Sequence, residues 1–208
     1  VLISMFKESG YARFELKKPA IRKKPFLDIL RLAGVDIFVE KDCVSVKKSN
    51  IKAFEFSAED CPDLVPIASV LGAYSDGKCV IKNVERLRIK ESDRILSTIA
   101  MLNAFNIKAE SDGKNLIVYG GKPVGGEIDS FNDHRIVMMA AIAAMVSDDV
   151  VIINNADAVN KSYRTFFEDY KKIVYAYELA QSTLYFDKST IHIKKGDNVV
   201  VISGKDKG

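Results

Sequence analysis

The run Arg88–Ile95 (RIKESDRI) is the part of the sequence whose residue types point most directly to chemistry. It carries both signs of charge and leads into an apolar, helix-like segment, which places Arg94 in the first turn of a predicted helix. A cation is unfavourable there, because the free N–H groups and the dipole of a helix already make its N-terminus positive. An anionic partner would remove that penalty, so this helix start is a candidate anion-binding site.

Two further predicted helix starts carry chemically useful side chains. Asp63 opens one of these helices, and Asn132-Asp133 forms an N-cap pair that places Arg135 in the first turn of the other. In folds with repeated units, equivalent helix ends gather on one side of the sheet, so we expect these side chains to lie together. The expected cluster consists of Asp63, Lys90, Glu91, Arg94 and Arg135.

Such a cluster could bind and transform a small anion. Two arginines can hold a carboxylate or a phosphate through paired hydrogen bonds, and carboxylates among them can act as general base or acid. No serine or cysteine lies in a recognisable nucleophile motif, and two histidines cannot make a metal cluster. The sequence therefore argues against covalent and metal-dependent hydrolysis.

Each of these residues also has a purely structural explanation. Glu91 and Arg94 could form a surface ion pair on one helix face, and Asp63 could be only an N-cap. His134 could be a structural histidine, and Lys161 could be a solvated loop lysine. A site is favoured because the unusual charges recur at successive helix starts.

The composition is that of an ordinary globular protein. Apolar residues make up 48% of the chain, and 31 basic against 28 acidic residues give a net charge of +3, so anion binding must come from local placement of charge. Cys43, Cys61 and Cys79 are not at metal-ligand spacing, so we expect reduced thiols in a cytoplasmic protein. No apolar run reaches the roughly 18 residues of a membrane span, and no signal peptide is visible. The start at Val1, in the middle of an element, indicates a fragment or an excised domain.

Strands and helices alternate over residues 1–173, as expected for an α+β fold built from βαβαββ units. Residues 174–188 have no clear period and residues 191–208 have a strand–turn pattern, so a boundary is predicted near residue 173. The predicted strands are 11–16, 36–40, 43–47, 53–57, 79–82, 106–110, 115–119 and 150–154, and the predicted helices are 25–34, 63–74, 91–105, 134–145 and 164–173.

The segment 88–95, followed later by Asn132–Arg135 (NDHR), resembles the EPSP synthase family, the 3-phosphoshikimate 1-carboxyvinyltransferases. Supporting segments in the same order are Cys61–Pro66 (CPDLVP), Asn83–Leu87 (NVERL) and Asn160–Tyr163 (NKSY). The resemblance implies repeated βαβαββ units in an inverse half-barrel of the enolpyruvyl transferase type. It also implies a transferase of the shikimate pathway, in aromatic amino acid biosynthesis. Such an enzyme moves the enolpyruvyl group of phosphoenolpyruvate (PEP) onto the 5-hydroxyl of shikimate 3-phosphate and releases phosphate.

The resemblance assigns catalytic roles to three residues and needs no cofactor or metal. Asp63 matches the aspartate that holds and deprotonates the 5-hydroxyl of shikimate 3-phosphate. Glu91 matches the acid implicated in proton transfer at the PEP methylene. Lys161 matches the lysine near the PEP phosphate that also takes part in proton transfer.

The resemblance further assigns the substrate-binding residues. Arg94, Arg135 and Lys161 match residues that bind PEP, while Asp63 and Lys90 match positions on the shikimate 3-phosphate side. Only the C-terminal domain of the family is matched, over residues 1–173. The N-terminal domain is therefore expected as a missing partner, without which the chain would be inactive.

The end of the chain resembles a different family. Residues 191–208 (IHIKKGDNVVVISGKDKG) are similar to the opening of the KOW motif in a ribosomal large-subunit protein that binds RNA. Residues 174–190 would then be a poorly ordered linker to a truncated, KOW-like β segment. An alternative function is therefore a non-catalytic anion-binding or RNA-binding protein, with RNA as a partner only if this tail is functional.

Overall fold

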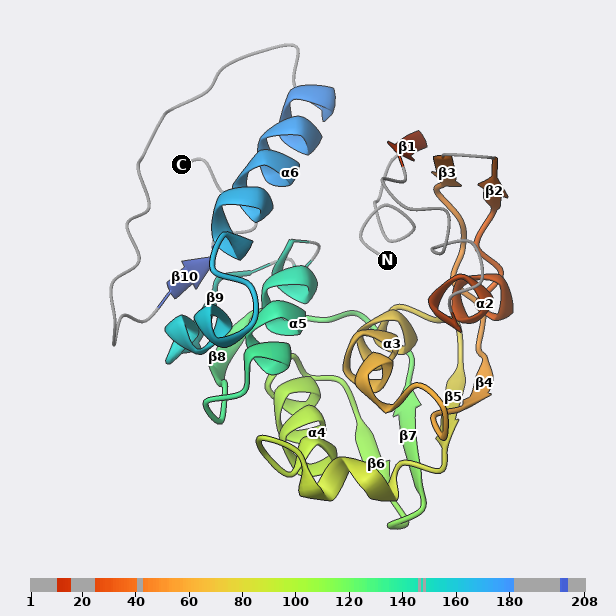
Figure 1. Cartoon of the computed structure of the whole chain (residues 1–208), viewed down its shortest axis with the longest axis vertical. Helices are drawn as coiled ribbons and strands as arrows, with labels where there is room; N and C mark the ends of the chain where they lie inside the picture. Colours follow the sequence, from red (N-terminus) through yellow and green to blue (C-terminus); the bar gives the residue numbers. More distant parts are fainter. Residues whose placement is uncertain are drawn as a thin grey trace.

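The computed structural model describes residues 11–15, 25–40, 43–145, 147, 149–181 and 199–201. Helices α3, α4 and α5 pack against one another in the middle of the molecule, and the strands lie around them (Figure 1). This mixture of helices and sheets confirms the predicted α+β class. Within those ranges, none of the helices combines the length and the hydropathy that a membrane crossing requires.

The first sheet has the order β1-β3-β2 and is antiparallel throughout. Strand β3 (Cys43–Lys47) lies between β1 (Tyr11–Glu15) and β2 (Ile37–Val39). Helix α2 (Pro25–Leu32) precedes β2. The turn between them needs Gly34, whose φ of 74° is a left-handed conformation that glycine adopts without steric penalty.

The middle of the chain has the order strand–helix–strand–helix–strand–strand, which is one βαβαββ unit. Its sheet has the order β4-β5-β7-β6, in which β4 and β5 are parallel and the other pairs are antiparallel. Parallel pairing requires a crossover connection, and α3 supplies it. The elements are β4 (Glu55–Ser57), the 3₁₀ helix η2 (Pro62–Leu64), α3 (Val65–Ala73), β5 (Lys78–Lys82), the 3₁₀ helix η3 (Glu85–Ile89), α4 (Arg94–Ala104), β6 (Ala109–Ser111) and β7 (Asn115–Tyr119).

The third sheet has the order β10-β9-β8. Strands β8 and β9 are parallel and joined by α5, while β10 pairs antiparallel with β9. The repetition of complete βαβαββ units remains a prediction. The elements are β8 (Gly126–Asp129), α5 (His134–Ala144), β9 (Val151–Asn154), the 3₁₀ helix η4 (Ala156–Lys161), α6 (Phe166–Gln181) and β10 (Val199–Val201).

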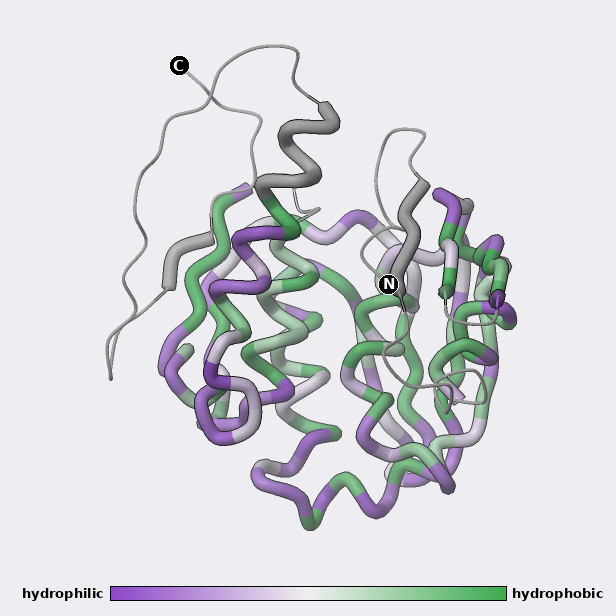
Figure 2. The backbone as a smooth tube through the Cα atoms, turned by 45° about the horizontal axis from the view of Figure 1, so that its top comes forward, coloured by the Kyte–Doolittle hydropathy of each residue, from purple (hydrophilic) through white to green (hydrophobic). Residues whose placement is uncertain are grey.

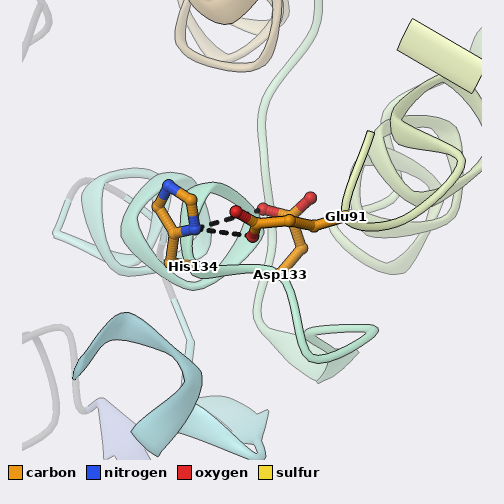
Figure 3. Close-up of side chains that lie close together, drawn as sticks. All are labelled: Glu91, Asp133 and His134. Carbon is orange, nitrogen blue, oxygen red and sulfur yellow. Dashed lines mark hydrogen bonds and ion pairs between the residues drawn. The ribbon is translucent and has the colours of Figure 1, made fainter. Parts of the chain in front are cut away.

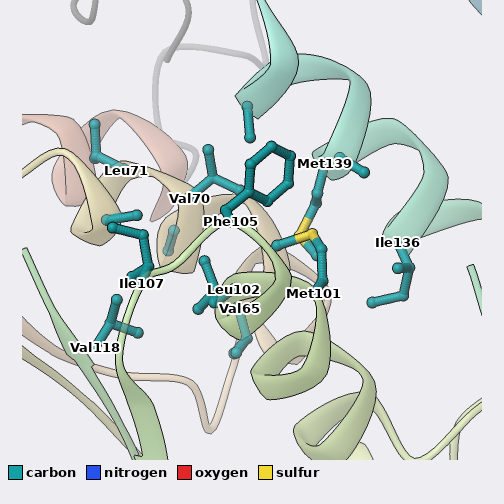
Figure 4. Packing of buried hydrophobic residues seen from close by; sticks show 14 of the residues in the cluster. Val65, Val70, Leu71, Met101, Leu102, Phe105, Ile107, Val118, Ile136 and Met139 are labelled. Atoms are coloured by element: carbon teal, nitrogen blue, oxygen red, sulfur yellow. The ribbon is translucent and has the colours of Figure 1, made fainter. Parts of the chain in front are cut away.

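The core lies where the three central helices meet the sheets. Met101 of α4 and Phe105, directly after this helix, pack towards Met139 of α5 and Val70 of α3 (Figure 4). The tube in Figure 2 is mostly hydrophobic along the inner helices, which accords with a core made chiefly by apolar burial. Because this core holds α3, α4 and α5 together, it also fixes their N-termini relative to one another. All three cysteines are free thiols, as predicted, and Cys43 and Cys79 are buried.

Two predicted helix boundaries were wrong by three residues or more. The helix predicted from Glu91 begins at Arg94, because the Asp93 side chain accepts hydrogen bonds from the backbone N–H groups of Ile95 and Leu96 and thereby caps the helix. The last helix continues past residue 173 to Gln181, since its final residues (VYAYELAQ) include good helix formers and no glycine or proline.

The predicted linker is therefore helical over 174–181, and residues 182–190 lie outside the described residues. Strand β10 falls within the predicted KOW-like segment and pairs with β9, whereas the rest of that segment also lies outside the described residues. Strand β8 and the three 3₁₀ helices were not predicted. The division of the chain into domains remains a prediction.

Candidate active site

The three helix starts singled out from the sequence meet in one place. Helix α3 is entered through η2, which carries Asp63, and α4 starts immediately after its N-cap Asp93. Helix α5 starts after its N-cap Asp133, whose carboxylate accepts the backbone N–H of Arg135 at 2.9 Å. These caps satisfy N–H groups that have no partner within a helix, and they fix the direction of the side chains that follow.

A buried ion pair joins α4 to α5. Arg94 is only 3% exposed and Asp133 is fully buried. The Nε of Arg94 donates to Oδ2 of Asp133 at 2.7 Å, and Nη2 donates to Oδ1 at 3.3 Å. Ser92 donates its hydroxyl to the same Oδ2 at 3.0 Å. The anion that the sequence required beside Arg94 is thus supplied within the chain by Asp133, together with Asp63.

The pKa of Asp133 is held below its usual value. Burial acts to raise the pKa, but the Arg94 guanidinium, the backbone N–H of Arg135 and the Ser92 hydroxyl all favour the charged carboxylate and outweigh burial. Asp133 is therefore ionised at neutral pH and holds Arg94 in a fixed orientation.

Asp63 sits at the centre of the cations. One of its carboxylate oxygens lies 3.0 Å from Nη1 of Arg94, and the other lies 3.0 Å from Nη2 of Arg135. Lys90 approaches the first oxygen at 3.6 Å. The Asp63 side chain is 47% exposed, so this convergence of two guanidinium groups and an ammonium group lies at the surface of the molecule. The geometry shows that these cations can share one small carboxylate.

Glu91 pairs with a histidine on the opposite helix. The two side chains point towards each other (Figure 3), with Oε2 of Glu91 2.7 Å from Nδ1 of His134. The same oxygen lies 3.7 Å from Nη2 of Arg94. Because Glu91 precedes α4, its contact with Arg94 is not the predicted pairing on one helix face. Glu91, Asp133 and His134 bring potential metal-ligand atoms within 4.8 Å of one another. However, Asp133 and Glu91 already face the Arg94 guanidinium, and a cation in that position disfavours a metal ion.

Lys161 reaches the same region from the end of η4. Its Nζ donates to the backbone carbonyl of Asn132 at 2.5 Å, next to the N-cap of α5. Five of the six predicted site residues thus form one network of ion pairs: Asp63, Lys90, Glu91, Arg94 and Arg135. The sixth, Lys161, contacts the turn beside the N-cap of α5.

Three contributors to this site were not predicted from the sequence. Ser92 and Asp133 hold Arg94, and His134 holds Glu91. The sequence indicates Asp133 only as a helix cap and allows His134 to be a structural histidine. The presence of an acid and a histidine directly before Arg135 is the one local signal that could have identified them.

The solved structures place the fold in the class of enolpyruvyl transferases. An EPSP synthase from Acinetobacter baumannii matches with a TM-score of 0.73 and 25% identity, covering 82% of this chain and 43% of that chain. The enolpyruvyl transferase NikO from Streptomyces tendae shares the fold, with a TM-score of 0.63 and 22% identity over 82% of this chain and 40% of that one.

The sequence comparisons identify the family within this class. The EPSP synthase family (3-phosphoshikimate 1-carboxyvinyltransferase) matches residues 16–170, so the chain belongs to this family, as the resemblance predicted. The 3-phosphoshikimate 1-carboxyvinyltransferase of Clostridium novyi is 46% identical over 153 residues, which are 72% of this chain and 35% of that protein. Its counterpart in Pyrococcus abyssi is 38% identical over 148 residues, or 71% of this chain and 36% of that protein. The chain spans about a third of the length of these curated relatives.

Proposed function

We propose that this chain supplies the PEP-binding part of an EPSP synthase active site. The reaction would transfer the enolpyruvyl group of PEP to the 5-hydroxyl of shikimate 3-phosphate and release phosphate. The observation that carries the proposal is the convergence of Arg94 and Arg135 on the two oxygens of one carboxylate, that of Asp63. A PEP carboxylate or phosphate fits the same donors, since paired guanidinium–oxyanion contacts recognise both groups.

The addition step needs an acid and a base in fixed positions. A proton is added to C3 of PEP while the 5-hydroxyl oxygen attacks C2 and loses its own proton, which gives a tetrahedral intermediate. Glu91 would deliver the proton to C3, and its contact with His134 supports a fixed orientation for that step. Asp63 would accept the proton of the 5-hydroxyl.

The elimination step reverses the proton movement at C3. The C–O bond to phosphate breaks, C3 loses a proton, and the enolpyruvyl double bond re-forms. Lys161 would stabilise the departing phosphate and take part in this proton transfer, while the arginines hold the carboxylate. Lys90 would contact shikimate 3-phosphate.

The remaining ligands are proposed to come from the part of an EPSP synthase that this chain does not match. The chain corresponds to about a third of the curated relatives' length, and a reaction between two anionic substrates depends on assembling all of their ligands. We therefore expect no transferase activity from the chain alone and activity when the amino-terminal domain of a relative is added. A cytoplasmic location remains a prediction.

The test is phosphate release from PEP and shikimate 3-phosphate, with and without a separately produced amino-terminal domain of the Clostridium novyi relative. Arg135→Gln should abolish the release that reconstitution restores. Arg31→Gln is the matched control, because within the described part of the chain the ion pair of Arg31 is with its exposed neighbour Asp28 on α2. Turnover by the chain alone, or full activity of Arg135→Gln, would contradict the proposal.

A further inference from the structure

The residues immediately before α5 have an unusual backbone. Phe131 and Asn132 both lie in the left-handed region, with φ values of 51° and 54°, although neither is a glycine. Asparagine tolerates this conformation better than most residues, whereas a bulky residue such as phenylalanine rarely adopts it. Two consecutive left-handed residues therefore indicate that their surroundings impose the conformation.

The two side chains that directly precede this turn hold it. The carboxylate of Asp129 accepts the backbone N–H of Phe131 at 2.8 Å, and the hydroxyl of Ser130 accepts the N–H of Asn132 at 3.2 Å. Ser130 donates its own hydroxyl to the carbonyl of Asn155, the N-cap of η4, at 3.2 Å. The turn is thus attached to the helix that carries Lys161.

The turn presents a main-chain acceptor to Lys161. The ammonium group donates to the Asn132 carbonyl, not to the Asn132 side chain. A lysine side chain loses considerable rotamer entropy when it is fixed, so an acceptor in a rigid position reduces that cost before a ligand arrives. An ammonium group has three donors, so two remain available to a substrate oxygen.

We propose that the left-handed pair Phe131-Asn132 is a positioning element that orients the Lys161 ammonium through the Asn132 carbonyl. This inference rests on the proposed function for its catalytic meaning, but the hydrogen bond itself can be tested without activity. The Asn132 side chain is dispensable in this account, and the left-handed backbone is essential.

Two substitutions at one position separate these contributions. Asn132→Gly removes the side chain but keeps a residue that adopts positive φ readily, whereas Asn132→Val introduces a β-branched residue that does not. Asn106→Val is the matched control, because Asn106 also has a positive φ of 59° but lies after the far end of α4.

The first readout is the NMR spectrum of the lysine ammonium groups in the full chain. We expect a slowly exchanging Lys161 signal with a scalar coupling across the hydrogen bond to the Asn132 carbonyl carbon in the wild type. The signal should persist in Asn132→Gly and Asn106→Val and be lost in Asn132→Val. Absence of the coupling in the wild type, or an unchanged signal in Asn132→Val, would overturn the inference. The wild-type spectrum alone tests the hydrogen bond between Lys161 and the Asn132 carbonyl, even if a variant fails to fold.

The second readout is the affinity of the chain for PEP. Asn132→Val should weaken binding about tenfold, as expected when a charge-assisted hydrogen bond loses its alignment, while Asn132→Gly should bind like the wild type. If Lys161→Met leaves PEP affinity unchanged, the role of Lys161 in the proposed function fails, and the NMR result still decides the positioning role. Equal loss of affinity in the glycine and valine variants would refute the main-chain argument.

Discussion

Replacing Asp133 with asparagine should destabilise the protein by far more than a surface substitution would. The substitution removes the buried negative charge that faces Arg94, which is itself only 3% exposed. Removing one member of a buried ion pair typically costs about 3–5 kcal/mol, because the other charge is left without compensation. Asp63 would still contact Arg94 from the surface, so we expect the lower end of that range, about 3 kcal/mol.

The helix cap is not the reason for this loss. Asparagine caps helices about as well as aspartate, so the acceptor for the Arg135 N–H survives in Asp133→Asn. Asp93→Asn is the matched control. Asp93 caps α4 in the same way, and its side chain accepts the backbone N–H groups of Ile95 and Leu96. The control should change stability by less than about 0.5 kcal/mol.

The assay is urea denaturation followed by circular dichroism, which gives the free energy of unfolding for each variant. A loss of about 3 kcal/mol corresponds to roughly 6–12 °C in the midpoint of thermal unfolding for a chain of this size. Asp133→Asn and Asp93→Asn should differ clearly in both measurements. Equal stability of the two variants would refute the claim that the charge of Asp133 holds Arg94 in place.

Three further predictions follow from the same cluster. The folded-state pKa of Asp133 lies below the unfolded value of about 3.9, so the stability that its charge contributes is complete above that pH and is lost as the pH falls through the folded pKa. Urea titrations below pH 4 should therefore show a steeper loss of unfolding free energy for the wild type than for Asp133→Asn. Parallel losses in the two proteins would argue against this role. Asp63→Ala should release Nη1 of Arg94 and Nη2 of Arg135 and tighten binding of inorganic phosphate roughly two- to fivefold, since partly exposed ion pairs contribute up to about 1 kcal/mol. Calorimetry that shows weaker binding would exclude competition by Asp63. Glu91→Gln should lower kcat of the reconstituted enzyme about 10²- to 10⁴-fold with little change in KM for PEP, because the proposed role of Glu91 is proton transfer. An increase in KM with an unchanged kcat would show that Glu91 only binds substrate.

The sequence predicts the members of the site better than their partners. Capping and first-turn charge are local effects, so Asp63, Arg94 and Arg135 stand out without any knowledge of the fold. The contact between Arg94 and Asp133 joins residues 39 positions apart, and only the packing of α4 against α5 reveals it.

The predicted boundaries of helices and strands were wrong where capping, strand pairing or helix propensity outweighed the hydrophobic pattern. Asp93 is a better N-cap than Glu91, so α4 begins three residues later than its apolar pattern suggested. Strand β8 (GEID) is too short for its alternation to be recognised, and it is stabilised by parallel pairing with β9. The end of α6 was missed because the residues after 173 have good helix propensity but no clear hydrophobic period.

The central claim is that Arg94, Arg135 and Lys161 form a PEP-binding cluster, and an NMR titration of the isotope-labelled chain with PEP tests it most directly. We predict saturable shifts centred on the backbone amides of Asp63, Arg135 and Lys161, and we predict that Arg135→Gln abolishes them while Arg31→Gln does not. Shifts that are centred elsewhere, or that persist unchanged in Arg135→Gln, would contradict the account.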